Sequence, residues 1–197
     1  MLSRDEQTTT KPVVLGGQGS SIDTPGWPIW NQRDRDQLAR VLESGWWAFE
    51  GPAEAEFEWR FAELQTARHG LCVANGTVAL QLALEALDIG VGDEVIVPGF
   101  TWQATAAAVV DVNAMPILVD ADPETYCPDP DAIEAAITPM TKAIIVVHLY
   151  DSLSDMDRIL EIAARHRLYV VEDCAHSHGS QWNGRGVGSL GDIGTFS

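Results

Sequence analysis

Short apolar runs alternate with helical stretches through the last two thirds of the chain, and this alternation constrains the fold more than any other feature. The β-branched, apolar runs occupy 71–74, 94–97, 116–119, 143–147 and 169–172. The helical stretches between them occupy 77–87, 102–110, 130–136 and 154–166. Strands that are apolar on both faces and separated by helices are typical of a parallel sheet covered on both sides. We therefore predict an α/β domain with a mostly parallel, doubly wound sheet flanked by helices.

The part of the chain before this alternation has a different composition. Residues 1–30 are rich in Gly, Pro, Ser and Thr, which predicts an extended N-terminal arm. Apolar residues at helical spacing within 38–42 and 57–64 predict two amphipathic helices. We assign 31–197 to one large domain, and because 191–197 alternate like a strand leaving a loop, we expect that domain to be incomplete here.

The charge and the cysteines exclude several classes of protein. A net charge of -17, from 29 acidic and 12 basic residues, repels nucleic acids and anionic lipid surfaces. The N-terminus lacks the apolar core of a signal peptide, and no apolar run is long enough for a membrane helix. The three cysteines, Cys72, Cys127 and Cys174, form no CxxC pair. We expect a cytoplasmic protein with reduced thiols and with no nucleic acid or membrane partner.

Ligands of such a sheet bind beyond the carboxyl ends of its strands. At Gly76 a strand turns into a helix that starts near Thr77, where backbone N–H groups and a hydroxyl could hold a phosphate. An ordinary capped helix is the alternative. Trp102 follows the next strand and could lay its ring on a flat cofactor, or it could simply be part of the core.

A third candidate lies at the end of the strand 169–172. There a buried strand delivers Asp173 and then His176 to the same edge of the sheet. A buried carboxylate needs a cationic partner, and a protonated pyridine nitrogen would supply one. The alternative is that Asp173 only caps the following loop.

Two other motifs carry less weight. Residues 186–191 match GxGxxG, but the motif follows a polar turn and precedes a strand, so a nucleotide-binding oxidoreductase domain is a poor interpretation. His176 and His178 resemble a metal-binding pair, yet Cys174 is the only nearby thiol and no carboxylate completes the set by spacing. We predict no metal site.

Taken together, the chain resembles the DegT/DnrJ/EryC1/StrS family of aminotransferases, which aminate keto sugars and keto cyclitols. The matching stretches are SGWW at 44–47 with GP at 51–52, ANGT at 74–77, GDEVIVP at 92–98, TW at 101–102, HLY at 148–150, EDCAH at 172–176, and 191–197. Asp151 departs from the family's usual His-Leu-Tyr-Gly, which puts the local turn in question.

The resemblance implies a large domain of the aspartate-aminotransferase-like fold (fold type I) that binds pyridoxal 5'-phosphate. The implied cofactor-binding residues are Gly76, Thr77, Val78, Trp102, Asp173, His176 and Ser197. The first three and Ser197 would hold the phosphate, Trp102 would stack on the pyridine ring, and Asp173 would pair with its nitrogen. His176 takes the place of a glutamine that many members have near the phenolic oxygen.

The resemblance also places the family's Schiff-base lysine beyond Ser197. Neither Lys11 nor Lys142, the two lysines of the chain, is placed to take its role, so we predict no catalytic residue and no turnover for this chain alone. The resemblance implies that the whole protein transfers an amine to a keto sugar or keto cyclitol, with L-glutamine as the donor in the family's cyclitol branch. It also implies a homodimer. The alternatives are a sugar dehydratase of the same family, with histidine replacing the lysine, and a non-catalytic protein acting in subunit association.

Overall fold

The computed structural model describes residues 13–15, 17, 26, 28–47 and 51–197 and divides the chain into two units, 1–47 and 48–197. The first unit contains a 3-10 turn at Val13–Leu15 and the helix α1 at Gln32–Ser44. Asn31 begins α1 with a capping box, and Gly45 ends it at a φ of 74°. Most of the predicted arm lies outside the described residues, so its boundary at residue 30 stays a prediction.

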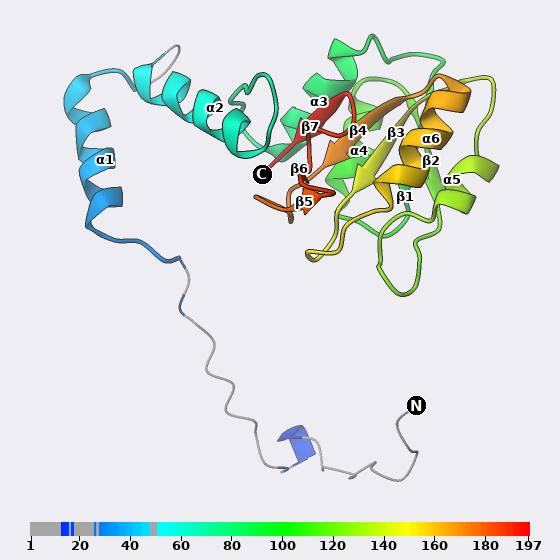
Figure 1. The fold of residues 1–197 in the computed structure, drawn as a ribbon, viewed down its shortest axis with the longest axis horizontal. Helices are drawn as coiled ribbons and strands as arrows, with labels where there is room; N and C mark the ends of the chain where they lie inside the picture. Colours follow the sequence, from blue (N-terminus) through cyan, green and yellow to red (C-terminus); the bar gives the residue numbers. More distant parts are fainter. Residues whose placement is uncertain (1–12, 16, 18–25, 27, 48–50) are drawn as a thin grey trace. The chain divides into compact units, whose positions relative to one another are not determined.

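The second unit is built on a five-stranded sheet in which every pair of neighbours is parallel (Figure 1). The strand order is β2-β1-β3-β4-β7. The strands are β1 (Glu94–Pro98), β2 (Met115–Val119), β3 (Thr141–Val147), β4 (Tyr169–Asp173) and β7 (Ile193–Thr195). The predicted parallel sheet is confirmed.

Helices cover both faces of this sheet, as predicted (Figure 1). In β3, Ile145 and Val147 face the cluster that contains α3 and α4, whereas Ile144 and Val146 face the cluster that contains α5 and α6. The helices of this unit are α2 (Pro52–Leu64), α3 (Gly76–Ala86), α4 (Ala104–Asp111), α5 (Pro130–Ala135) and α6 (Met156–His166). Among the helices of the described residues, none has the length and apolar character needed to cross a membrane.

A small antiparallel hairpin precedes the last strand. It pairs β5 (Gln181–Trp182) with β6 (Arg185–Gly186). Asn183 and Gly184 form its turn with φ values of 50° and 79°, a conformation that an Asn-Gly pair adopts readily. The glycine motif at 186–191 therefore joins a hairpin to β7 and opens no helix.

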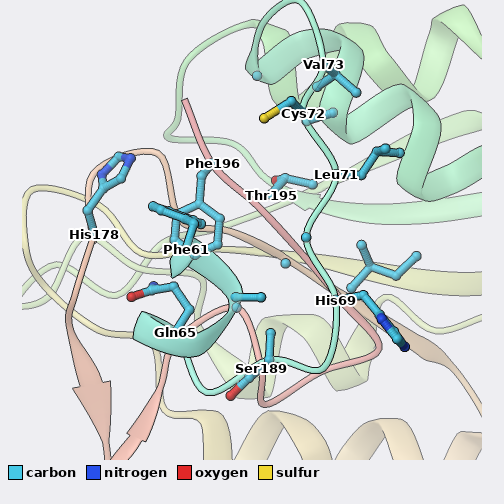
Figure 2. A pocket seen from close by; sticks show the side chains of 18 of the residues that line it. Phe61, Gln65, His69, Leu71, Cys72, Val73, His178, Ser189, Thr195 and Phe196 are labelled. Atoms are coloured by element: carbon cyan, nitrogen blue, oxygen red, sulfur yellow. The ribbon is translucent and has the colours of Figure 1, made fainter. Parts of the chain in front are cut away.

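The prediction of a strand at 71–74 is wrong. The segment has no ladder partner within the described residues, and the backbone N–H of Cys72 donates instead to the Glu58 carboxylate at 2.7 Å. A cavity of about 1320 Å³ is lined on one side by this segment and on the other by 188–197 (Figure 2). An apolar run becomes a strand only where a neighbouring strand accepts its hydrogen bonds, and the described residues place no strand beside this one.

Candidate functional site

The parallel sheet brings the predicted site residues toward one edge, because the carboxyl ends of its strands point the same way. Asp173 is the last residue of β4, and Trp102 lies in the loop after β1. Ser197 follows β7, the neighbour of β4, and Gly76 begins α3. Four separate segments thus supply the candidate site.

Asp173 is a nearly buried carboxylate, 8% exposed, held by two hydrogen bonds. Its Oδ2 accepts from the Thr105 hydroxyl at 3.0 Å, and its Oδ1 accepts from the backbone N–H of Ala175 at 3.3 Å. Burial raises the pKa of Asp173 despite these bonds. None of the salt bridges among the described residues includes it. The contact with the following loop that the alternative predicts is present, but it is not a contact with a cation.

Trp102 is not a core residue, because its side chain is 74% exposed. Its carbonyl accepts a hydrogen bond from the backbone N–H of Thr105 at 3.1 Å, in the first turn of α4. The same turn therefore carries an accessible indole ring and the hydroxyl that binds Asp173.

The N-terminus of α3 combines both interpretations that the sequence left open. Asn75 caps the helix by accepting from the backbone N–H of Val78 at 3.0 Å. The N–H groups of Gly76 and Thr77 have no partner among the described residues. A Cβ at Gly76 would lie 2.8 Å from the Ser197 Cβ, so only glycine allows this approach. Two free donors and a serine hydroxyl meet there, whereas the Val78 N–H is already engaged.

His176 and His178 have different surroundings. The exposed His176 ring stacks on Tyr150, with centroids 5.6 Å apart, and its Nδ1 accepts from the Tyr150 backbone N–H at 3.4 Å. His178 instead contacts the rings of Phe61 and Phe196 (Figure 2). Each imidazole thus packs against its own aromatic partners, and a shared metal site finds no support in this geometry.

A buried polar centre lies directly beside the candidate site. The Glu172 Oε1 accepts from the N–H groups of Leu190 at 2.8 Å and Gly191 at 2.7 Å. Its Oε2 is 2.9 Å from the Gly188 N–H and 3.2 Å from the His148 Nε2. The glycine motif therefore uses its N–H groups to bind a carboxylate of the protein itself.

The electrostatics of this centre favour a charged Glu172. Burial alone would raise the pKa of Glu172, but the hydrogen bonds from His148, Gly188 and Gly191 outweigh it and lower the pKa. The backbone N–H of Ser154 donates to the His148 Nδ1 at 3.2 Å, so the Nε2 proton points at Glu172.

Cys174 lies close enough to Glu172 and His148 for the three to be considered as metal ligands. However, the carboxylate and imidazole atoms are already hydrogen-bonded, and burial raises the pKa of the Cys174 thiol. The group is accounted for as a structural centre.

The large cavity covers only part of the predicted site. Gly76 and Ser197 line it, whereas Trp102, Asp173 and His176 do not. The structure thus brings Gly76 and Ser197 together on one side, and joins Trp102 to Asp173 through Thr105 on the other.

The sequence interpretation missed Thr105, His148 and Glu172 as functional or supporting residues. Thr105 could have been noticed as a hydroxyl one turn after Trp102, in a helix otherwise made of alanine and valine up to Asp111. Glu172 could have been noticed as a second carboxylate, next to Asp173, in a buried strand. Its partners at 188–191 are too distant in sequence to be inferred from a pattern.

Comparison with known proteins agrees with this geometry. The DegT/DnrJ/EryC1/StrS aminotransferase family matches residues 28–197. The L-glutamine:2-deoxy-scyllo-inosose aminotransferase of Streptoalloteichus tenebrarius is 51% identical over 94% of the chain. The chain spans 46% of that relative's length.

Solved structures give the same result. An aminotransferase from Psychrobacter cryohalolentis is 43% identical, with a TM-score of 0.83 over 88% of this chain and 44% of its own. A protein from Streptococcus pneumoniae, described as a sugar aminotransferase in its PLP form, is 33% identical, with a TM-score of 0.82 over 86% of this chain and 47% of its own. The predicted aspartate-aminotransferase-like fold is confirmed, and the chain belongs to the DegT/DnrJ/EryC1/StrS aminotransferase family.

Proposed function

We propose that this chain supplies cofactor-binding residues of a pyridoxal-phosphate-dependent aminotransferase that acts on a keto cyclitol. The observation that carries this proposal is Asp173, a buried carboxylate at the carboxyl edge of the sheet that forms no salt bridge within the described part of the chain. An exposed Trp102 and the free N–H groups of Gly76 and Thr77 accompany it. These residues fit a flat, cationic ring that carries a phosphate.

Each of these residues would recognise a different part of the cofactor. Asp173 would hold a proton on the pyridine nitrogen, which strengthens the ring as an electron sink when pyridoxal phosphate is bound. Trp102 would cover one face of the ring. Gly76, Thr77 and the Ser197 hydroxyl would bind the phosphate, since free N–H groups at a helix N-terminus attract anions.

His176 would act as a hydrogen-bond donor at the phenolic oxygen. Its Nδ1 accepts from the Tyr150 N–H, so in the neutral imidazole the proton resides on Nε2. The stacked Tyr150 ring would hold the imidazole plane.

The substrates are proposed from the relatives. The Streptoalloteichus protein is named for L-glutamine and 2-deoxy-scyllo-inosose, and at 51% identity we propose the same donor and a keto cyclitol acceptor. A keto sugar is the second candidate, since one matching structure is described as a sugar aminotransferase. Glutamine would first transfer its amino group to the bound cofactor, and the acceptor would then receive that amino group. This order predicts ping-pong kinetics.

The lysine needed for this chemistry is proposed to come from sequence beyond Ser197. Lys142 lies at the start of β3, and in a parallel sheet that is the edge opposite the end of β4 where Asp173 lies. Lys11 lies outside the described residues. We therefore propose that the 197-residue chain binds the cofactor without covalent attachment and does not turn over.

We also propose a cytoplasmic homodimer. The cysteines Cys72, Cys127 and Cys174 are all free, in keeping with a reducing compartment. Phe57 and Trp59 of α2 are 57% and 64% exposed, a degree of apolar exposure that favours contact with another chain. Sedimentation of the wild type and of Trp59→Glu would test this, with a dimer expected only for the former.

The experiment that tests the proposed function completes the chain with the C-terminal half of the Streptoalloteichus relative. The chimera should bind pyridoxal phosphate and aminate 2-deoxy-scyllo-inosose with L-glutamine, and the intact relative is the positive control. A folded, cofactor-bound chimera that aminates only keto sugars would contradict the cyclitol assignment. A folded chimera that binds no cofactor would contradict the proposal as a whole.

A further inference from the structure

We propose that Thr105, supported by Thr101, is a positioning residue that fixes the Asp173 carboxylate for the pyridine nitrogen. The inference rests on the proposed function and adds a hydroxyl relay that holds the proposed nitrogen partner. Thr105 would touch neither the cofactor nor the substrate, and it would act through Asp173.

The direction of the hydrogen bonds in this relay follows from the number of protons available. Thr105 has one hydroxyl proton and donates it to the Asp173 Oδ2 at 3.0 Å. The Thr101 hydroxyl lies 3.0 Å from the Thr105 hydroxyl, so Thr101 must be the donor of that bond. Consecutive hydrogen bonds polarise one another, so the Thr101 bond makes Thr105 a stronger donor to the carboxylate.

The relay is rigid where it meets Asp173. Thr105 is fully buried in the first turn of α4, and its β-branched side chain has few rotamers in a helix. On the other side of the carboxylate, the Ala175 N–H binds Oδ1 at 3.3 Å. Donors from two elements therefore fix the plane of the carboxylate, and each oxygen keeps acceptor capacity for a further proton.

The same turn of α4 couples two parts of the proposed recognition. The Thr105 N–H bonds to the carbonyl of Trp102, so the backbone that presents the indole also presents the hydroxyl. A shift of this turn would move the ring that covers the cofactor face and the group that orients its nitrogen partner together.

The surroundings of Asp173 make the Thr105 hydroxyl consequential. Burial has the largest influence on the pKa of Asp173 and raises it, whereas the hydrogen bonds from Ala175 and Thr105 and the nearby His176 and His148 act in the opposite direction. Glu172 precedes Asp173 on β4, and Cys174 follows it. The contribution of α4 is an uncharged hydroxyl. Without that hydroxyl, Asp173 keeps one longer hydrogen bond in a buried place, which disfavours the ionised form that a pyridinium needs.

The test is a titration of the 197-residue chain with pyridoxal phosphate at several pH values. Tryptophan fluorescence measures binding at each pH. Thr105→Val keeps the shape and removes the hydroxyl, Thr105→Ser restores it, and Thr101→Val removes only the supporting donor. We expect Thr105→Val to weaken binding about tenfold at neutral pH. This loss of affinity should become larger as the pH falls, because Asp173 of the Thr105→Val variant takes up its proton at a higher pH than Asp173 of the wild type. Thr105→Ser should bind like the wild type, and Thr101→Val should show a smaller loss of the same kind.

The outcomes separate this inference from the proposed function. Asp173→Asn must bind much more weakly than the wild type, and if it binds equally, the proposed function itself fails. If Asp173→Asn is impaired while Thr105→Val keeps the affinity and pH profile of the wild type, the relay is overturned and the function stands. A Thr105→Val loss that is uniform over pH would also overturn it. Should Thr105→Val fail to fold, the pH profile of Thr101→Val decides between the same two results.

Discussion

Glu172 and Asp173 are neighbours on β4, yet the two regions that they belong to are opposite in character. Glu172 is fully buried and accepts four hydrogen bonds, from the loop before β7 and from His148. Asp173 accepts two, and has no cation among the described residues. The pKa of Glu172 is lowered, whereas burial raises that of Asp173.

This difference separates an acid whose hydrogen-bonding capacity is met by the protein from an acid that keeps free acceptor capacity. Side chains of consecutive strand residues point to opposite faces, so adjacent carboxylates can serve unrelated purposes. The protein satisfies Glu172 completely and leaves Asp173 with acceptor capacity at the open edge of the sheet. A buried carboxylate whose hydrogen-bond acceptor capacity is not fully used therefore indicates a candidate site better than burial or an acidic side chain alone.

The largest expected effect on stability comes from replacing Glu172, the acid whose hydrogen bonds are all made within the protein. Glu172→Gln removes the charge that His148 and the loop N–H groups bind and places an amide N–H₂ group against donors. We expect the free energy of unfolding at neutral pH to fall by about 3 to 5 kcal/mol, as for other broken buried pairs. Urea denaturation followed by circular dichroism measures this.

Glu134→Gln is the matched control for that variant. Glu134 pairs with Arg165 at 2.6 Å, but at the surface, where solvent screens the charges, so its loss should cost much less than the loss of Glu172. Equal losses for the two variants would mean that the Glu172 centre is not a main source of stability.

The pH dependence of the same difference sharpens the comparison. Because the folded state lowers the pKa of Glu172, its contribution is complete above the ordinary glutamate pKa and disappears as the pH falls through the lowered value. The stability gap between the wild type and Glu172→Gln should therefore narrow in acid. A gap that stays constant down to the acid transition would contradict the assignment of a buried, ionised Glu172.

The neighbouring acid should respond in the opposite direction. Burial raises the pKa of Asp173, so its ionised form destabilises the cofactor-free fold above that pKa, and the penalty is absent below the ordinary aspartate value. We expect Asp173→Asn to raise the free energy of unfolding at neutral pH and to have no advantage in acid. Thermal melts without cofactor at the two pH values measure this. Marked destabilisation at neutral pH would show that Asp173 is a structural residue like Glu172.

The smallest expected effect concerns the segment 148–151. Its His148 contacts Glu172, and its Tyr150 contacts His176 near the candidate site. Asp151 has a φ of 63°, so the chain keeps a left-handed turn at the position where relatives were expected to have glycine. Asp151→Gly should therefore stabilise the protein by less than about 1 kcal/mol, and Asp151→Ala should not. Equal melting temperatures for the glycine and alanine variants would argue against backbone strain at this turn.

The sequence predicted most of the fold because periodic apolar burial is a local signal. The strands from β1 to β7 that form the sheet, and the helices on its faces, lie close to their predicted ranges. The segment 71–74 is apolar like the strands of the sheet, but it has no pairing partner among the described residues. A local sequence pattern does not reveal which strands will pair. Hydrophobicity alone therefore cannot distinguish this segment from a true strand.

The candidate site was predictable only in part for the same reason. Asp173 ends β4 and Trp102 follows β1, so their positions could be inferred from the sheet. The contacts of Thr105 with Asp173 and of Glu172 with 188–191 join residues from separate elements. Such contacts depend on side-chain geometry after packing, and no spacing rule contains them.

We propose that Asp173 is kept available for the nitrogen of pyridoxal phosphate. The most direct measurement is the dissociation constant of pyridoxal phosphate at neutral pH for the wild type and Asp173→Asn, with Lys142→Ala as a control at the opposite edge of the sheet. We predict that Asp173→Asn weakens binding by at least about tenfold and that Lys142→Ala binds like the wild type. Equal affinity of Asp173→Asn and the wild type would contradict the claim.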